Sequence, residues 1–357
     1  MQSQKPPDPE RSADVRRLEK DMLDKLRTRT VAAAAALLPA LGAVGCGDSS
    51  GDAAAEGKLQ AALVMPCTAS DPWCGQALSA AKKLEAEGKI ELKVTTNAPQ
   101  DTAGISRVLA QYAQSGTDLV IAHSTWGDAV LEVAKKFGDT HFATYGSTGA
   151  DNVALLEEPL YEASYLAGML AGDITKSGVI GGTAGQDIAL CHALLKAFEL
   201  GAQRVRKGTK MIATYIGDWN DAAKGRQATM SQHQQGSDVA IACGGGPANG
   251  MVQAIKATNT GGFGYMGDMR SLAPKNLVGS VTYNLVPYYT ALVNDVASGS
   301  TQPGKKYHFG LAQGGVDLTL NPDYPANARL TTGIKEMEKV KKQIVDGTFK
   351  VPYVTEG

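Results

Sequence analysis

The sequence lacks a net charge, a dense set of histidines and any apolar run long enough to cross a bilayer. Its 35 Lys+Arg residues nearly balance 36 Asp+Glu residues, so it carries no electrostatic footprint for nucleic acid. Five scattered histidines and the absence of a CxxC pair argue against a metal site, and no cofactor fingerprint is found. Because a spanning helix needs roughly 20 apolar residues, the chain is not expected to be a permease.

The longest apolar run, Val31–Gly45, follows a short basic stretch and ends directly before Cys46. A positive flank, a short apolar core and small residues before a cut are typical of an export signal. With cysteine after the small residues, the segment resembles a bacterial lipobox. It predicts that Cys46 is lipidated, so that the protein is anchored to a membrane on its periplasmic or extracellular face. The alternative is an ordinary secretory signal followed by a coincidental cysteine.

These signals divide the chain into three parts. Residues 1–45 are interpreted as an N-terminal extension with a signal peptide, and residues 46–57 as a flexible Gly/Ser/Asp/Ala-rich tether. Met22 is an alternative start that would leave a signal peptide of normal length. Residues 58–357 are long enough to form two lobes, each with its own core.

Strands and helices alternate along these residues, starting with an apolar strand at Leu59–Pro66 and an amphipathic helix at Pro72–Glu87. A second series of the same kind begins with a helix at Leu160–Thr175. The alternation predicts an α/β protein with two doubly wound parallel-sheet lobes. We expect the N-terminal lobe to contain 58–156 and 268–305, and the C-terminal lobe 157–267 and 306–357.

Four cysteines remain once Cys46 is set aside, an even number for an oxidising compartment. Cys67 and Cys74 are close enough in the sequence to bridge one loop, whereas Cys191 and Cys243 would have to meet within the second lobe. The alternative is four unpaired thiols.

Ligands of doubly wound sheets bind outside the carboxyl ends of the strands, so the loops after the strands hold the candidate site. All three tryptophans of the chain fall in such loops. Each alone could be a core residue, but together they predict aromatic faces that sandwich a flat ring. The candidate ligand-binding residues are Trp73, Ser124, Trp126, Asp128, Trp219 and Asp268.

Other motifs give weaker signals. The Gly-rich turns 181–187 and 243–250 lack the spacing and lysine of a phosphate-binding loop, and we interpret them as tight turns near the ligand. His192 follows Cys191, but neighbouring residues on a helix diverge, so this pair does not predict thiol catalysis. No GxSxG elbow appears between a strand and a helix, and the protein is not expected to be an enzyme.

Several stretches resemble the basic membrane protein family, lipoprotein substrate-binding subunits of ABC transporters that include purine nucleoside receptors. The helix signature YEASYLAGMLA at 161–171 is followed by TKSGVIGG at 175–182. Further matching stretches cover essentially the whole mature chain: 197–202, 218–225, 236–239, 267–274 and 287–289.

The resemblance implies a type I periplasmic-binding-protein fold, two lobes with a hinge, closing on one small ligand. It puts Trp219 at an aromatic position that stacks on the nucleobase, and Trp73 where the first loop of the family has Phe. Asp268 matches an acid that hydrogen-bonds the ligand, while Ser124 and Trp126 lie in the matching loop of the first lobe. The usual Ser-Phe-Asn of the first loop reads Pro72-Trp73-Cys74 here, which leaves room for a modified base or another flat heterocycle.

The sequence therefore predicts a monomeric, lipid-anchored receptor that captures a purine-like molecule and presents it to an ABC permease. One alternative is an exported nucleoside hydrolase that uses Asp128 and Asp268 as its acid and base. Another is a ligand sensor of the same fold that signals to a membrane partner.

Overall fold

The computed structural model describes residues 58–325 and 328–356. The expected signal peptide at 1–45, the lipidation site Cys46 and the tether at 46–57 lie outside the described residues. The description below concerns the unit that spans residues 56–357, in its described part. Within the described residues, no helix combines the length and the apolar character that a membrane crossing requires.

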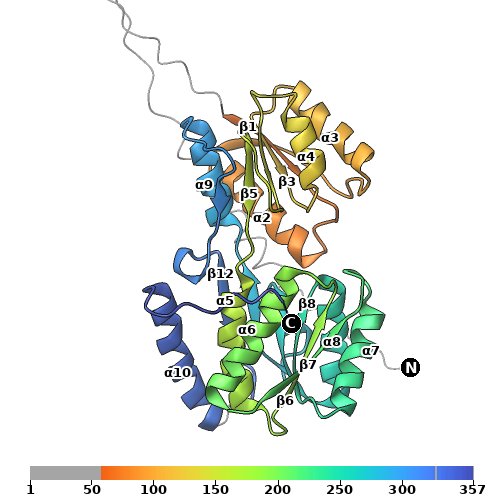
Figure 1. Cartoon of the computed structure of the whole chain (residues 1–357), viewed down its shortest axis with the longest axis vertical. Helices are drawn as coiled ribbons and strands as arrows, with labels where there is room; N and C mark the ends of the chain where they lie inside the picture. The colour runs from red at the N-terminus through yellow and green to blue at the C-terminus, as the bar shows by residue number, and fades with distance from the viewer. Residues whose placement is uncertain (1–57, 326–327, 357) are drawn as a thin grey trace, which may run out of the picture. The chain divides into compact units, whose positions relative to one another are not determined.

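The first sheet has the strand order β11-β5-β4-β3-β1-β2, and all of its strand pairs are parallel. Interior strand β1 is almost wholly buried, as expected for a parallel strand covered on both faces. Helices α2 and α9 pack on one face, and α3 and α4 pack on the other (Figure 1). The elements are β1 (Leu59–Val64), α2 (Pro72–Ala86), β2 (Ile90–Thr95), α3 (Thr102–Gln114), β3 (Leu119–Ala122), α4 (Gly127–Ala134), β4 (His141–Thr144), β5 (Val153–Leu156), α9 (Val286–Ala297) and β11 (Lys306–Tyr307).

The second sheet has the order β12-β10-β9-β8-β6-β7, and only β12 runs antiparallel to its neighbour. Helices α5, α6 and α10 lie on one side of it, and α7 and α8 on the other (Figure 1). The elements are α5 (Leu160–Ile174), β6 (Val179–Ala184), α6 (Ala189–Val205), β7 (Lys210–Tyr215), α7 (Ala222–Gln234), β8 (Val239–Cys243), α8 (Gly245–Thr258), β9 (Gly261–Met266), η1 (Arg270–Leu272), β10 (Leu277–Tyr283), η2 (Leu311–Gln313), β12 (Val316–Leu320) and α10 (Ala328–Val345).

The chain passes between the two sheets three times: after β5, after β10 and after β11. This differs from the expected boundaries, which assigned all of 268–305 to the first lobe and all of 306–357 to the second. Strand β10 instead pairs with β9 in the second sheet, and β11 pairs with β5 in the first. The reason is that an apolar run predicts a strand but not the sheet that the strand joins.

Helices α5 and α6 approach each other through glycines. A Cβ atom added at Gly168 would lie 2.0 Å from the Phe198 carbonyl oxygen, and one at Gly201 would lie 2.0 Å from the Tyr165 carbonyl oxygen. The hydroxyl of Ser164 donates to the Leu194 carbonyl oxygen at 2.8 Å across the same interface. Small residues thus allow the two helix backbones to pack directly against each other.

We expect Gly168→Ala to lower the free energy of unfolding by about 1–3 kcal/mol, because the added methyl group forces the helices apart. Urea denaturation of the purified domain measures this loss. Gly138→Ala is the matched control, since a Cβ atom there meets nothing within 4 Å. Equal stability of the two variants would contradict the close packing.

Candidate functional site

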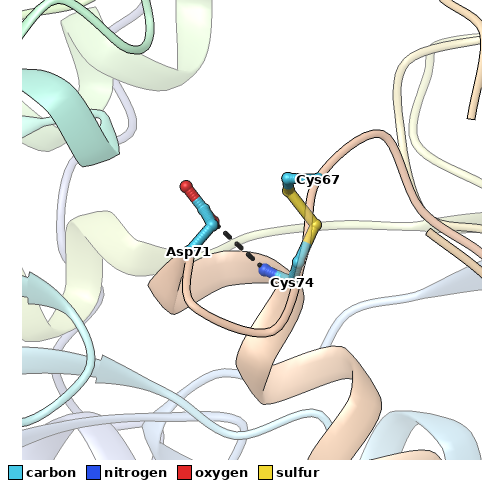
Figure 2. A group of neighbouring side chains, drawn as sticks. All are labelled: Cys67, Asp71 and Cys74. Carbon is cyan, nitrogen blue, oxygen red and sulfur yellow. Dashed lines mark hydrogen bonds between the residues drawn. A yellow bond between two sulfur atoms is a disulfide. The ribbon is translucent and has the colours of Figure 1, made fainter. Parts of the chain in front are cut away.

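The loop before α2 is fixed by a helix cap and a disulfide. Asp71 is the N-cap of α2, and its Oδ1 accepts from the backbone N–H groups of Trp73 at 2.8 Å and Cys74 at 3.2 Å. Cys67 and Cys74 form a disulfide that closes the loop, as Figure 2 shows. The first of the two expected cysteine pairings is therefore present. These constraints hold Trp73 on the first turn of α2.

Cys67, Asp71 and Cys74 also lie as close together as metal ligands do, with their ligand atoms within 4.8 Å of one another. However, metal binding by cysteine needs thiolates, and both sulfurs are used in the disulfide. Asp71 is engaged in capping the helix (Figure 2). These three residues thus stabilise the loop and the start of α2, and they do not form a metal centre.

The indole of Trp73 is held by three other side chains. Its ring centroid lies 4.0 Å from that of His123 and 5.4 Å from that of Tyr145. Its Nε1–H donates to Oε1 of Glu158 at 2.7 Å. Trp73 follows β1, His123 follows β3 and Tyr145 follows β4. The partly exposed ring of Trp73 is therefore contacted by residues from the carboxyl ends of neighbouring strands. It is also contacted by Glu158 from the first crossover, the segment between β5 and α5 where the chain first passes to the second sheet.

His123 is fully buried, and its Nδ1 lies 3.3 Å from the hydroxyl oxygens of both Tyr145 and Tyr289. Its Nε2 has no hydrogen-bond partner among the residues that the structure describes. Burial lowers the pKa of His123 to about 3, and the nearby backbone of Trp73 offsets only part of this. The imidazole is therefore neutral at physiological pH and offers a flat, uncharged face to the indole.

Glu158 follows β5 in the crossover to α5; the residue is partly exposed, and its carboxyl group accepts the hydrogen bond from the indole of Trp73. Desolvation raises the pKa of Glu158 to about 7, and the hydrogen bond from Trp73 works against this rise. In turn, the Glu158 carboxylate helps to raise the pKa of Tyr145, Tyr265 and Tyr289, although burial is the main cause in each.

Trp219 lies at the corresponding edge of the second sheet, in the loop after β7. A Cβ atom at Gly185 would lie 2.6 Å from Cε3 of its ring, and one at Gly244 would lie 3.0 Å from the same atom. Its carbonyl oxygen accepts from the backbone N–H of Gly246 at 2.8 Å. Gly244 has a backbone φ of 119°, a value that residues other than glycine rarely adopt. The Gly-rich turns after β6 and β8 thus give the indole room to pack on the strand ends.

The loop before α2 also approaches the strand ends of the second sheet. A Cβ atom at Gly245 would lie 3.1 Å from Oδ2 of Asp71, and one at Gly267 would lie 3.5 Å from Nε2 of Gln76. Gly245 follows directly on Gly244, against which Trp219 packs. The segments carrying Trp73 and Trp219 therefore come from facing ends of the two sheets.

The second expected disulfide, Cys191–Cys243, is present and joins the start of α6 to the end of β8. Because Cys243 directly precedes Gly244, the disulfide also fixes the turn against which the Trp219 ring packs. Nearby, both ring nitrogens of His192 form hydrogen bonds: Oδ1 of Asp187 accepts from Nε2 at 2.5 Å, and the Tyr215 hydroxyl lies 2.9 Å from Nδ1. His192 is thus part of a polar cluster rather than a partner of Cys191.

The remaining candidates are placed differently. Trp126 is only 7% exposed, packs in the core between the first sheet and α3–α4, and donates its Nε1–H to Gln100 at 3.3 Å. This core lies on the face of the sheet opposite α2, so Trp126 does not join the Trp73 cluster. Ser124 is buried, and its carbonyl oxygen accepts from the hydroxyl of Thr144.

Neither aspartate belongs to the aromatic cluster either. Asp128 is exposed in the first turn of α4. Asp268 is exposed after β9 and forms an ion pair with Arg270, with Nε 2.9 Å from Oδ2. The geometry thus gives no support to an acid–base pair made of these two residues.

The sequence reasoning missed His123, Tyr145 and Glu158. His123 and Tyr145 directly follow β3 and β4, and Glu158 is the second residue after β5. Their positions after strands of the first sheet are the signal that could have found them, as it found the tryptophans.

His123 and Glu158 have opposite effects on the pH dependence of stability. Below its ordinary pKa of 6.5, His123 takes up a proton in the unfolded chain but not in the fold, so acidification destabilises the protein. Between 4.5 and about 7, Glu158 keeps a proton in the fold that the unfolded chain has lost, so acidification stabilises it. From pH 6.5 down to 4.5 the two contributions oppose each other.

We therefore expect Glu158→Gln to lose stability relative to the unmodified protein as pH falls from 7 to 4.5, by at most about 1.4 kcal/mol per pH unit. His123→Gln should show the opposite trend. Urea denaturation at several pH values measures both. A stability difference that does not change with pH would refute the assignment of these protons.

The chain matches known proteins along its described length. A family model described as "ABC transporter substrate-binding protein PnrA-like" matches residues 58–354. A nucleoside-binding protein of an ABC transporter from Lactococcus lactis is 29% identical over 63% of this chain and 68% of its own length. A purine-binding protein of Brucella abortus is 27% identical over 78% of this chain and 80% of its own length. Basic membrane protein D of Borreliella burgdorferi is 27% identical, and the match spans 57% of that relative.

Solved structures support the same architecture. An ABC transporter solute-binding protein from Conexibacter woesei has a TM-score of 0.68 at 20% identity, covering 84% of this chain and 100% of that one. One from Aeropyrum pernix has a TM-score of 0.68 at 20% identity, covering 82% and 94%. The expected fold class is thereby confirmed: two parallel-dominated sheets in the periplasmic binding protein type I arrangement.

Proposed function

Because the chain belongs to the PnrA-like family of ABC transporter substrate-binding proteins, we propose that it binds a purine base, a purine nucleoside or a similar flat heterocycle for import. The observation that carries this proposal is the placement of Trp73 and Trp219 at facing strand ends of the two sheets. The names of the Lactococcus and Brucella relatives support a ligand of this chemical class.

The physical reason is the match between an indole and a nucleobase. Stacked aromatic rings attract each other by about 0.5–1.5 kcal/mol beyond the burial of their area. Because the indoles come from different lobes, a ring between them contacts both only when the lobes are closed. Binding then shifts the population toward the closed form. The polar groups at the same strand ends, Glu158 and Asp71 among them, are suited to select among bases.

The closed receptor would deliver its ligand to an ABC permease, while Cys46 would keep it at the membrane as a monomer with a lipid anchor. The lipobox-like segment supports this anchor. Mass spectrometry of the mature N-terminus tests it, since a lipidated Cys46 adds the mass of its acyl chains. An unmodified cysteine, or cleavage elsewhere, would refute it.

Direct identification of the ligand tests the function. The mature domain is purified without refolding, and small molecules released on denaturation are identified by mass spectrometry. Calorimetry then compares adenosine, guanosine and adenine with uridine and ribose. We expect purine compounds to bind at least tenfold more tightly than ribose. Preference for ribose would refute the aromatic site, and release of free base from a nucleoside would show a hydrolase instead.

A further inference from the structure

The first crossover is tightly connected to the other segments that join the two lobes. The hydroxyl oxygen of Tyr288 lies 2.9 Å from the carbonyl oxygens of both Glu157 and Phe309, which share its single proton. Glu157 also donates its backbone N–H to the Tyr307 carbonyl oxygen at 3.1 Å. These hydrogen bonds fix the backbone next to Glu158 at the point where the chain passes from the first sheet to the second.

From this crossover the Glu158 side chain reaches a residue 85 positions earlier in the chain. Its Oε1 accepts the Trp73 Nε1–H at 2.7 Å, while the face of the indole lies on His123, with ring centroids 4.0 Å apart. A ring that packs on one face can still rotate in its own plane. The hydrogen bond at Nε1 removes that freedom and sets the direction of the indole edge.

We propose that Glu158 is a positioning residue that couples the inter-lobe crossover to the ligand-facing indole of Trp73. This inference rests on the proposed function, in which Trp73 stacks on the ligand. Glu158 acts through Trp73, because a fixed ring loses less conformational freedom when a ligand stacks on it. Movement of the crossover as the lobes open would then reorient the indole and weaken its hold on the ligand.

The strength of this coupling depends on the charge of Glu158. An ionised carboxylate accepts an N–H bond more strongly than a neutral carboxyl group does. The charge of Glu158 acts on tyrosines with raised pKa values, one directly after β4 and the others on β9, β10 and α9, namely Tyr145, Tyr265, Tyr283, Tyr288 and Tyr289. His123 beneath the indole is neutral, and Asp71 also raises the pKa of Tyr265. Glu158 is therefore the group of this cluster that titrates near pH 7.

A double-mutant cycle tests the coupling. Affinity for adenosine is measured by calorimetry at pH 6 and pH 8 in Glu158→Gln, Trp73→Phe and the double variant. Phenylalanine keeps a stacking ring but cannot donate the N–H bond. We expect each single change to weaken binding at pH 8 about threefold to tenfold, and the double variant to be no weaker than the worse single one. Independent effects that multiply would overturn the proposal.

The unmodified protein should bind more tightly at pH 8 than at pH 6, and this difference should vanish in Glu158→Gln. Glu132→Gln is the matched control, since Glu132 is exposed on α4, away from the cluster. It should keep the full pH dependence. If the pH dependence survived in Glu158→Gln, a carboxylate other than Glu158 would be responsible and the proposal would fail.

A measurement without ligand separates this proposal from the proposed function. Tryptophan fluorescence is titrated from pH 5 to pH 9, and we expect a transition near pH 7 that is absent in both Trp73→Phe and Glu158→Gln. If no purine binds, the proposed ligand class fails while the fluorescence transition still reports the Glu158–Trp73 coupling. A transition that persists in Glu158→Gln overturns the coupling itself.

Discussion

Replacing Trp73 or Trp219 with alanine is expected to weaken purine nucleoside binding by about tenfold to 100-fold for each residue. Each substitution removes a stacking contact of about 0.5–1.5 kcal/mol together with the apolar area that the ring buries on the ligand. A loss of 1.4 kcal/mol corresponds to tenfold in the dissociation constant. Calorimetry on the ligand-free domain measures the effect, and the double variant should lose binding almost completely.

The structure supplies a matched control for this experiment. Trp126 is the third tryptophan of the chain, but it packs in the α3–α4 core, with its Nε1–H on Gln100. Trp126→Phe keeps an aromatic ring in that core and should change the dissociation constant by less than about twofold. Unchanged affinity in Trp73→Ala and Trp219→Ala would refute the stacking site, as would a large loss in Trp126→Phe.

Removal of the Cys191–Cys243 disulfide is expected to cause the largest loss of stability among the changes considered. The bridge joins residues 52 apart in the sequence. In the chain-entropy account, closing a loop of this size stabilises the fold by about 4 kcal/mol. The variant with both cysteines changed to alanine should therefore show a much lower denaturation midpoint in urea.

The Cys67–Cys74 bridge is the natural comparison, because it closes a separation of only 7 residues and should contribute about 2.5 kcal/mol. Its removal should have the larger effect on ligand affinity, since its loop carries Asp71 and Trp73. If Cys191→Ala/Cys243→Ala were no less stable than Cys67→Ala/Cys74→Ala, loop length would not govern the stability of this protein.

Much of the fold could be predicted from the sequence because its signals are local. Apolar runs such as Leu59–Val64 and the helices between them follow from hydrophobic periodicity. The even cysteine count of a chain expected to be exported indicated two pairings, with unpaired thiols as the alternative, and the structure contains both disulfides. The assignment of β10 and β11 to sheets did not, because strand pairing depends on contacts between distant segments.

The site could be predicted in part for a similar reason. The rule that ligands bind at strand ends leads to Trp73 and Trp219, which the structure places at facing ends of the two sheets. It does not say to which face a side chain turns, and Trp126 turns into the α3–α4 core. Glu158 could not be linked to Trp73, since a bond between residues 85 apart leaves no periodic trace in the sequence.

The late position of β11 affects the order in which the molecule can assemble. Strand β11 is an edge strand of the first sheet and pairs with β5, although about 150 residues, most of them in the second sheet and its helices, separate the two strands in the chain. A polypeptide that emerges from a ribosome or a translocation channel with its N-terminus first cannot complete its first sheet until Tyr307 has emerged. The first sheet therefore stays without its edge strand until the C-terminal part of the chain has emerged.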